Sequence, residues 1–234
     1  MFVVVTTQAP LGPPRHRPSR TAWQPVLVPA GSAGPSPPCP LRPRRTRVAE
    51  RSWVDVQAAW LDGADALFEL LVERVPWQRY RRPMYERIVD EPRLVHHQPL
   101  DASLPDPRLA VLAAVLGAHY GVRFTTVGFN LYRDGRDSVA WHGDRVARRG
   151  GESVVAIVSL GEPRPFRLRR RGGRPGWTWR PGHGDLLVMG GACQFECEHA
   201  VPKVAVARPR LSVMFRHEPA GRARDERPGW AVAP

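Results

Sequence analysis

The second half of the chain is a series of short strand-like segments separated by turns. After Gly121, runs of β-branched and aromatic residues alternate with glycine, proline and aspartate, a pattern typical of antiparallel strands. We predict strands over residues 126–132, 153–160, 166–170, 185–189, 195–200 and 211–215. Because these strands follow a helical first half, the chain is predicted to form an α+β domain with a mostly β core, a β-sandwich or jelly roll.

The first half combines helical patterns with proline-rich sequence. Apolar residues at helical spacing predict a helix over residues 53–75, interrupted near Gly63 and ended by Pro76. A second helix is predicted to start at Asp106 and to end at Gly121. Residues 76–107 contain six prolines, so we expect a loop there.

The ends of the chain differ from its centre. Residues 1–50 hold 11 of the 26 prolines, with seven arginines and one acid. This composition predicts a disordered tail, and the alternative is a basic arm that adds non-specific affinity for nucleic acid. We therefore place the folded domain at residues 51–217 and a C-terminal tail at 218–234.

Charge and cysteine content restrict the function classes. The net charge is +13, and Lys203 is the only lysine, so nearly all positive charge is arginine. Such a chain favours an anionic partner, with nucleic acid first. The sequence contains no run of about 18 apolar residues, so no membrane-spanning helix is predicted. Three cysteines are too few for a disulfide framework. We expect a monomer in a reducing cytoplasm.

A candidate metal site begins with His142 and Asp144. On an extended backbone, side chains two residues apart project from one face, so both can bind one metal ion. His199, which follows another strand-like run, is the candidate third ligand. Two imidazoles and one carboxylate form the facial arrangement of non-haem Fe(II) oxygenases. The same spacing recurs at His183 and Asp185, which we interpret as a turn into a strand.

A second polar group lies on the predicted strand at 211–215. Arg210, Ser212 and Arg216 share one face of that strand by its period of two. Arginines buried without a partner would be costly, so bidentate carboxylates are their natural partners. A solvent-facing strand with hydrated arginines is the alternative, and periodicity does not choose between the two faces.

Four motifs in order resemble those of one enzyme family. They are Asn130-Leu-Tyr132, Trp141-His142-Gly-Asp144, His199-Ala-Val-Pro-Lys203 and Arg210-Leu-Ser-Val-Met-Phe-Arg216. Together they resemble the AlkB family of 2-oxoglutarate- and Fe(II)-dependent dioxygenases, which demethylate alkylated nucleic-acid bases. The resemblance covers residues 53–217. It implies a double-stranded β-helix (jelly roll) with N-terminal helices and a lid of helix and loop over the active site.

The resemblance also implies roles for single residues. His142, Asp144 and His199 would bind Fe(II). The co-substrate 2-oxoglutarate would contact Asn130, Tyr132, Arg210 (through its distal carboxylate), Ser212 (where the family often has asparagine) and Arg216. The implied reaction removes methyl groups from bases of the 1-methyladenine and 3-methylcytosine type in DNA or RNA. It uses O2 and releases formaldehyde, succinate and CO2.

Substrate contacts are expected from two further regions. The lid and the basic segment contribute Arg81, Arg82, Met84, Tyr85, His96, Arg169, Arg170 and Arg171. His96 or its neighbour His97 would stack on a flipped base, while the arginines and nearby tryptophans would bind phosphate and stack on bases. A solvated basic hairpin is the alternative for the arginine segment.

Two other functions remain open at this stage. Val146 stands where the family often has an acid that reads the base, so a tRNA or protein hydroxylase of the same fold is one alternative. A non-catalytic nucleic-acid-binding module is the other. The complete set of His142, Asp144, His199 and Arg210 argues against it, because binding alone does not require these four residues together.

Overall fold

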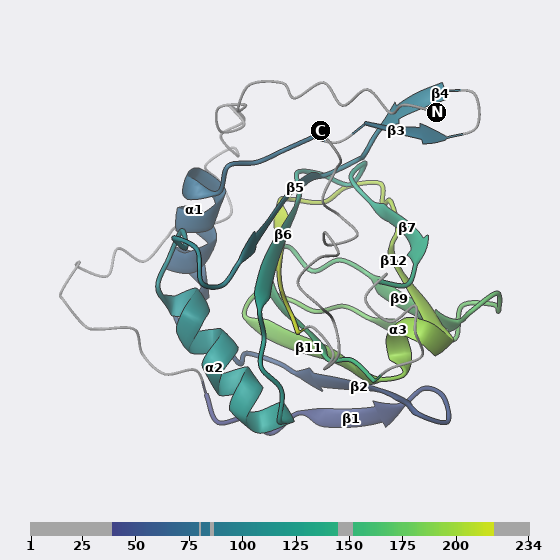
Figure 1. Cartoon of the computed structure of the whole chain (residues 1–234). Coiled ribbons are helices and arrows are strands. Elements are labelled where there is room, and N and C mark those ends of the chain that lie inside the picture. Colours follow the sequence, from purple (N-terminus) through teal and green to yellow (C-terminus); the bar gives the residue numbers. More distant parts are fainter. Residues whose placement is uncertain (1–38, 80, 85–86, 145–151, 218–234) are drawn as a thin grey trace, which may run out of the picture.

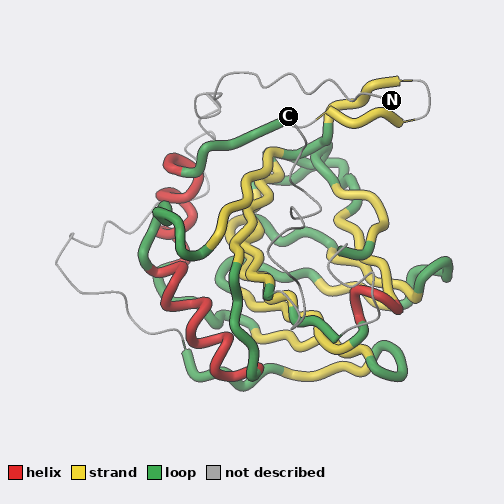
Figure 2. Tube along the Cα trace, viewed as in Figure 1, coloured by secondary structure: helices red, strands yellow, loops and turns green. Residues whose placement is uncertain are grey.

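Two antiparallel β-sheets form the body of the protein (Figures 1 and 2). The structure is a computed structural model that describes residues 39–79, 81–84, 87–144 and 152–217. The larger sheet has the order β1 (Arg44–Arg47), β2 (Ser52–Gln57), β11 (Asp185–Gly191), β8 (Val155–Gly161), β13 (Arg210–Arg216), β6 (Thr126–Tyr132) and β5 (Leu94–Pro99). The smaller sheet has the order β10 (Trp177–Trp179), β9 (Phe166–Arg170), β12 (Cys197–Val201) and β7 (Val139–His142). This arrangement confirms the predicted mostly β, jelly-roll fold.

Two helices cover the outer face of the larger sheet (Figure 1). They are α1 (Ala64–Arg74) and α2 (Arg108–Tyr120). Leu67 of α1 and Leu109 of α2 are fully buried in one hydrophobic cluster with alternate residues of the sheet. Since α2 ends at Gly121 in a left-handed conformation (φ 67°), the predicted helix end is confirmed.

The alternation of side chains along β13 shows which residues face the helices and which face the smaller sheet. Leu211, Val213 and Phe215 pack in the cluster beneath the helices. Arg210, Ser212, Met214 and Arg216 therefore face the smaller sheet, and Met214 packs in a second cluster between the two sheets. The alternative of a solvent-facing arginine strand is thus excluded, because both faces of β13 are covered.

Several predicted elements of the first half are wrong. Residues 52–57 form β2 rather than a helix, because they pair with β1 on one side and with β11 on the other. Helix α1 begins only after Gly63, which is left-handed (φ 66°). Residues 44–47, placed in the tail, form β1 and pair with β2. The tail prediction for residues 1–38 lies outside the described residues.

The supposed loop at 76–107 also contains strands. Strand β5 pairs with β6 as the edge of the larger sheet, and its prolines lie at its ends, where an edge strand tolerates them. A hairpin of β3 (Arg81–Met84) and β4 (Arg87–Asp90) extends from one end of the sheets (Figure 1). The predicted strand at 195–200 starts later, because the short helix α3 (Cys193–Glu196) precedes β12.

Among the described residues, no helix is sufficiently long and apolar to cross a bilayer. Cys39, Cys193 and Cys197 are free thiols, in agreement with the expected absence of a disulfide framework.

Candidate metal and co-substrate site

A β-bulge between β7 and β12 brings the two candidate histidine ligands together. His142 lies opposite His199, whereas Val139 lies opposite Val201. Three steps on β7 therefore match two steps on β12, so β7 holds one extra residue. On a regular strand, Val139 and His142 would point to opposite faces. The bulge turns His142 toward the space between the sheets, where its ring centroid lies 4.2 Å from that of His199.

The three candidate ligands form a compact group. Ligand atoms of His142, Asp144 and His199 all lie within 4.8 Å of one another. The Nδ1–H of His142 donates to the carbonyl oxygen of Ala140 (2.8 Å), which leaves its Nε2 lone pair available. His199 is buried and stacks on Phe166 at 5.4 Å. The group thus offers two imidazole nitrogens and one carboxylate.

The electrostatics of the group favour the protonation states that bind metal. Burial lowers the pKa of His199 to about 3, with a further contribution from His142, so His199 is neutral near pH 7. Burial alone would raise the pKa of Asp144, but Arg216, His199 and His142 outweigh it and hold that pKa well below its usual value. The Nε of Arg216 donates to Asp144 at 3.0 Å. This contact leaves the other carboxylate oxygen of Asp144 for a metal ion.

Among the described residues, Arg210 is a buried cation with no carboxylate partner. Its residue is 1% exposed, and its Nε donates to the hydroxyl of Ser159 (3.1 Å). Its guanidinium lies over the ring of Tyr132 at 5.4 Å. Nη1 has no hydrogen-bond partner among the described residues, and burial lowers the pKa of Arg210. Since a buried unpaired guanidinium is costly, this site favours a dicarboxylate that brings one carboxylate to Arg210.

The remaining predicted co-substrate residues lie on the same inner face. Asn130 and Ser212 are directly opposite each other on β6 and β13, and Tyr132 is opposite Arg210. The Nδ2 of Asn130 donates to the sulfur of Met214 at 3.5 Å. The donor set and the unsatisfied Arg210 thus fit Fe(II) with 2-oxoglutarate, and the assignment of single residues to them is part of our proposal below.

His96 does not lie where a base-stacking residue is needed. It pairs across the strands with Phe129 and stacks on it at 6.1 Å, on the helix-covered face of the sheet. The interpretation of His96 as a substrate contact is therefore wrong, because strand alternation turns it away from the metal site. His97 faces inward, since an added Cβ on Gly128 would lie 2.4 Å from His97 Nδ1 and 3.1 Å from Nη1 of Arg216.

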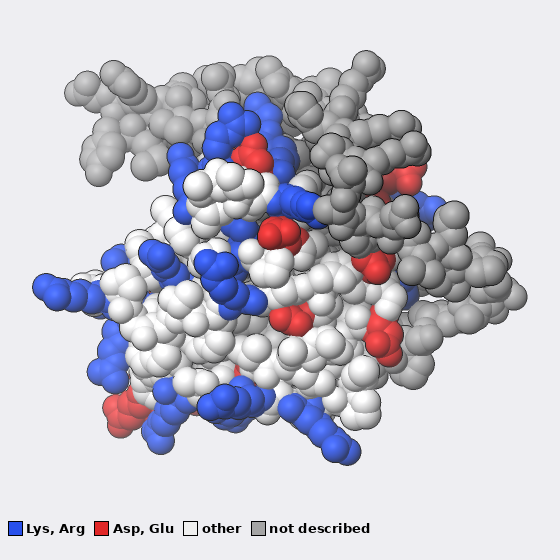
Figure 3. Space-filling model, turned by 180° about the vertical axis from the view of Figure 1, so that it is seen from behind, with Lys and Arg blue, Asp and Glu red and all other residues white. Residues whose placement is uncertain are grey.

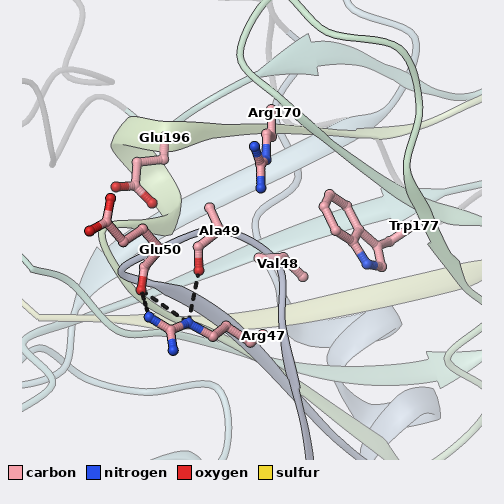
Figure 4. Close-up of a pocket in the computed structure, with 7 residues that line it drawn as sticks. All are labelled: Arg47, Val48, Ala49, Glu50, Arg170, Trp177 and Glu196. Carbon is pink, nitrogen blue, oxygen red and sulfur yellow. Dashed lines mark hydrogen bonds between the residues drawn. The ribbon is translucent and has the colours of Figure 1, made fainter.

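The predicted phosphate-binding arginines divide into two groups. Arg169 and Arg171 both contact Glu198, at 2.8 and 3.6 Å, and Arg169 also lies 4.4 Å from the ring of Trp141. Arg170 points elsewhere, into a groove of about 700 Å³ (Figure 4). That groove is lined by Arg47, Val48, Ala49, Glu50, Arg170, Trp177 and Glu196. The three arginines therefore do not form one phosphate-binding surface.

Arg81, Arg82 and Met84 lie on β3, whereas Tyr85 and Val146 lie outside the described residues. The helices do not act as the expected lid, because α1 and α2 cover the opposite face of the larger sheet.

The second His-x-Asp pair has a structural role, as predicted. Asp185 accepts hydrogen bonds from the backbone N–H groups of Ala59 (2.8 Å) and Gly182 (2.6 Å). His183 accepts the N–H of Gly161 (2.8 Å). Both side chains are thus used in fixing the turn that leads into β11.

Comparison with known proteins identifies the class to which this site belongs. The family model of the 2OG-Fe(II) oxygenase superfamily matches residues 64–223, so the chain belongs to that superfamily. This membership implies Fe(II), 2-oxoglutarate and O2, in agreement with the His-Asp-His group.

Within the superfamily the chain is AlkB-like. It is 31% identical over 186 residues to alpha-ketoglutarate-dependent dioxygenase alkB homolog 3 of Bos taurus, covering 67% of this chain and 62% of that protein. It is 28% identical over 189 residues to DNA oxidative demethylase ALKBH2 of Arabidopsis thaliana, covering 64% and 60%. The chain thus spans about three fifths of the length of these curated relatives. The structure of OsALKBH1 shares the fold, with a TM-score of 0.54, 12% identity and coverage of 74% of this chain and 100% of that one.

Proposed function

We propose that this protein is an oxidative demethylase of N-alkylated bases in DNA or RNA. It would use Fe(II), 2-oxoglutarate and O2 and release formaldehyde, succinate and CO2. The observation that carries the proposal is the buried Arg210, which has no carboxylate partner in the described part of the chain and lies on the inner face of the sheet that borders the His-Asp-His group. A non-catalytic binding module would not require a buried arginine beside a His-Asp-His group.

In this proposal the chain's own residues hold and orient the reactants. His142, Asp144 and His199 bind the metal on one side, and Arg216 fixes the carboxylate of Asp144. Arg210 pairs with the distal carboxylate of 2-oxoglutarate. When bound, Fe(II) supplies O2 activation coupled to decarboxylation of that co-substrate.

Hydrogen-bonding groups complete the co-substrate site. Asn130, Tyr132 and Ser212 lie on the two strands that carry or adjoin Arg210. Ser212 is opposite Asn130, so the amide can supply the contact that a shorter serine side chain does not reach. The low pKa of His199 keeps its imidazole neutral, as a metal ligand must be.

A nucleic-acid substrate is supported by the relatives and by charge. One relative is named a DNA oxidative demethylase, and the chain carries a net charge of +13. On the back of the molecule the basic side chains lie mostly along the rim, and the centre carries few of them (Figure 3). We propose that the substrate contacts lie at the β3–β4 hairpin, where Arg81, Arg82, Met84 and Tyr85 would meet the flipped base and its phosphates.

One assay tests the proposed function. The protein is loaded anaerobically with Fe(II), then mixed with 2-oxoglutarate, O2 and oligonucleotides that carry 1-methyladenine or 3-methylcytosine. Mass spectrometry follows methyl loss and succinate. We expect both products together. Succinate without methyl loss would show a different substrate, as for a tRNA or protein hydroxylase, and absence of succinate would favour a binding module.

A further inference from the structure

The short helix α3 packs against the loop that carries Asp144 and hydrogen-bonds to it. Gln194 in α3 is 2% exposed. Its Oε1 accepts the backbone N–H of Asp144 at 2.9 Å, and its Nε2 points to the sulfur of Met189 at 3.7 Å. Because these are different atoms of one amide, the side chain has a single orientation that satisfies both contacts.

The contact between α3 and the loop is tight as well as polar. A Cβ added to Gly143 would lie 2.6 Å from the carbonyl oxygen of Gln194 and 2.8 Å from Nη2 of Arg171. Only glycine allows this approach, since Cβ atoms do not come so close to backbone oxygens. The residue between the two candidate ligands His142 and Asp144 is therefore packed directly on α3.

Arg171 also binds α3, next to Gly143. Its Nε donates to the carbonyl oxygen of Phe195 (2.9 Å) and its Nη2 to that of Gln194 (3.3 Å). Its backbone N–H donates to the carbonyl oxygen of Glu196 (2.9 Å). Arg171, predicted to bind phosphate, thus acts as a support for the turn that presents Gln194.

We propose that Gln194 is a positioning residue for the metal site, which sets the backbone of Asp144 so that its carboxylate meets His142 and His199. Helix α3 leads directly into β12, which carries His199. One short segment therefore contacts one ligand in the loop after β7, Asp144, and leads into the strand of another, His199 on β12. This inference rests on the proposed metal site. Partners that orient metal ligands in this way typically change metal affinity by 10–100-fold when they are removed.

The test measures binding of Mn(II), a redox-stable substitute for Fe(II), by electron paramagnetic resonance of the free ion. Gln194→Met keeps the side-chain length but removes the acceptor, and we expect its Kd for Mn(II) to rise about 10–100-fold. Gln194→Glu retains an acceptor oxygen and should restore most of the affinity. Gln57→Met, which removes an amide at the end of β2, is the matched control and should bind as the wild type does.

His199→Ala separates failure of the inference from failure of the site. If the wild type binds no Mn(II), or His199→Ala binds it equally well, the proposed metal site is wrong. If His199→Ala loses binding while Gln194→Met retains wild-type affinity, only the role of Gln194 is overturned. Melting temperatures verify that each variant is folded. Should Gln194→Met not fold, Gly143→Ala tests the same contact from the loop side, and unchanged affinity there would contradict the proposal.

Discussion

Arg210 offers the sharpest test of the proposed site, because its substitution should weaken ligand binding without lowering the stability of the free protein. We consider Arg210→Met, which keeps the aliphatic stem and removes the charge. Truncating one partner of a buried, hydrogen-bonded charge pair costs about 2–5 kcal/mol. The affinity for 2-oxoglutarate should therefore fall roughly 30-fold to several thousand-fold, at about 1.4 kcal/mol for each factor of ten.

The free protein should respond differently. Arg210 is 1% exposed and has an unsatisfied Nη1, so its removal relieves a desolvated charge. We expect the unfolding free energy without 2-oxoglutarate to stay constant or to rise by up to about 2 kcal/mol. Arg164 is the control, since it is equally buried and also has one unsatisfied nitrogen, Nε, but donates to three carbonyl oxygens, those of Asp134, Asp137 and Pro202, at 2.8–2.9 Å. Arg164→Met should lose about 3 kcal/mol or more, because three acceptors lose their donor.

Two measurements test the expected changes in affinity and stability. Isothermal titration calorimetry with 2-oxoglutarate and Mn(II) gives the affinity, and urea unfolding without ligand gives the stability. The reasoning is refuted if Arg210→Met binds 2-oxoglutarate as the wild type does, or if it destabilises the free protein as much as Arg164→Met.

Three further predictions concern other parts of the site. His142→Ala should abolish methyl loss in the mass-spectrometric assay while nucleic-acid binding in a gel-shift assay persists; loss of both would indicate a structural role. Burial and Arg216 lower the pKa of His97 to about 3, whereas an unfolded histidine titrates near 6.5. Between these two pKa values the unfolded chain binds a proton that the folded chain does not, so the free energy of unfolding should decrease as pH falls from about 6.5 toward 3. His97→Gln should make this decrease smaller, as measured by urea unfolding at several pH values. An unchanged pH dependence of stability in His97→Gln would contradict this prediction. Gly128→Ala, whose methyl would lie 2.4 Å from His97 Nδ1, should cost about 1–3 kcal/mol, and wild-type stability would show that the ring moves aside freely.

The sequence predicted most strands of the second half, though not β7 and β10, and in the first half it predicted helix α2 but missed the strands. Strands β6 and β9 match their predicted bounds, because short β-branched runs between glycines and prolines have few other ways to bury their apolar faces. In the first half, Trp53 and Val54 fit a helical spacing and a strand alternation alike, and pairing with β11 decided for the strand. Pro92 and Pro99 suggested a loop, whereas Pro92 precedes the edge strand β5 and Pro99 is its last residue.

The candidate site was recognised from four ordered motifs that resemble one family. Residue types and spacings alone suggested two imidazoles and a carboxylate at His142, Asp144 and His199, but they left open whether Arg210 points inward. Gln194 carried no such signal, since a single glutamine between two cysteines belongs to no ligand pattern. Its contact with Asp144 spans 50 residues of sequence and exists only once α3 packs on the loop.

The sequence by itself thus determined which groups are available, and the tertiary structure decided where they point. Strand periodicity places Arg210 on one of two faces of β13 but does not say which face is buried between the sheets. Arg210 points inward because α1 and α2 pack against the other face. His96 and His97 are neighbours of the same type, yet the pairing of β5 with β6 puts one beneath the helices and the other beside Arg216. One extra residue in β7 turns His142 toward His199. Such directions depend on register between distant strands, which is set by packing of the whole fold rather than by any local run of residues.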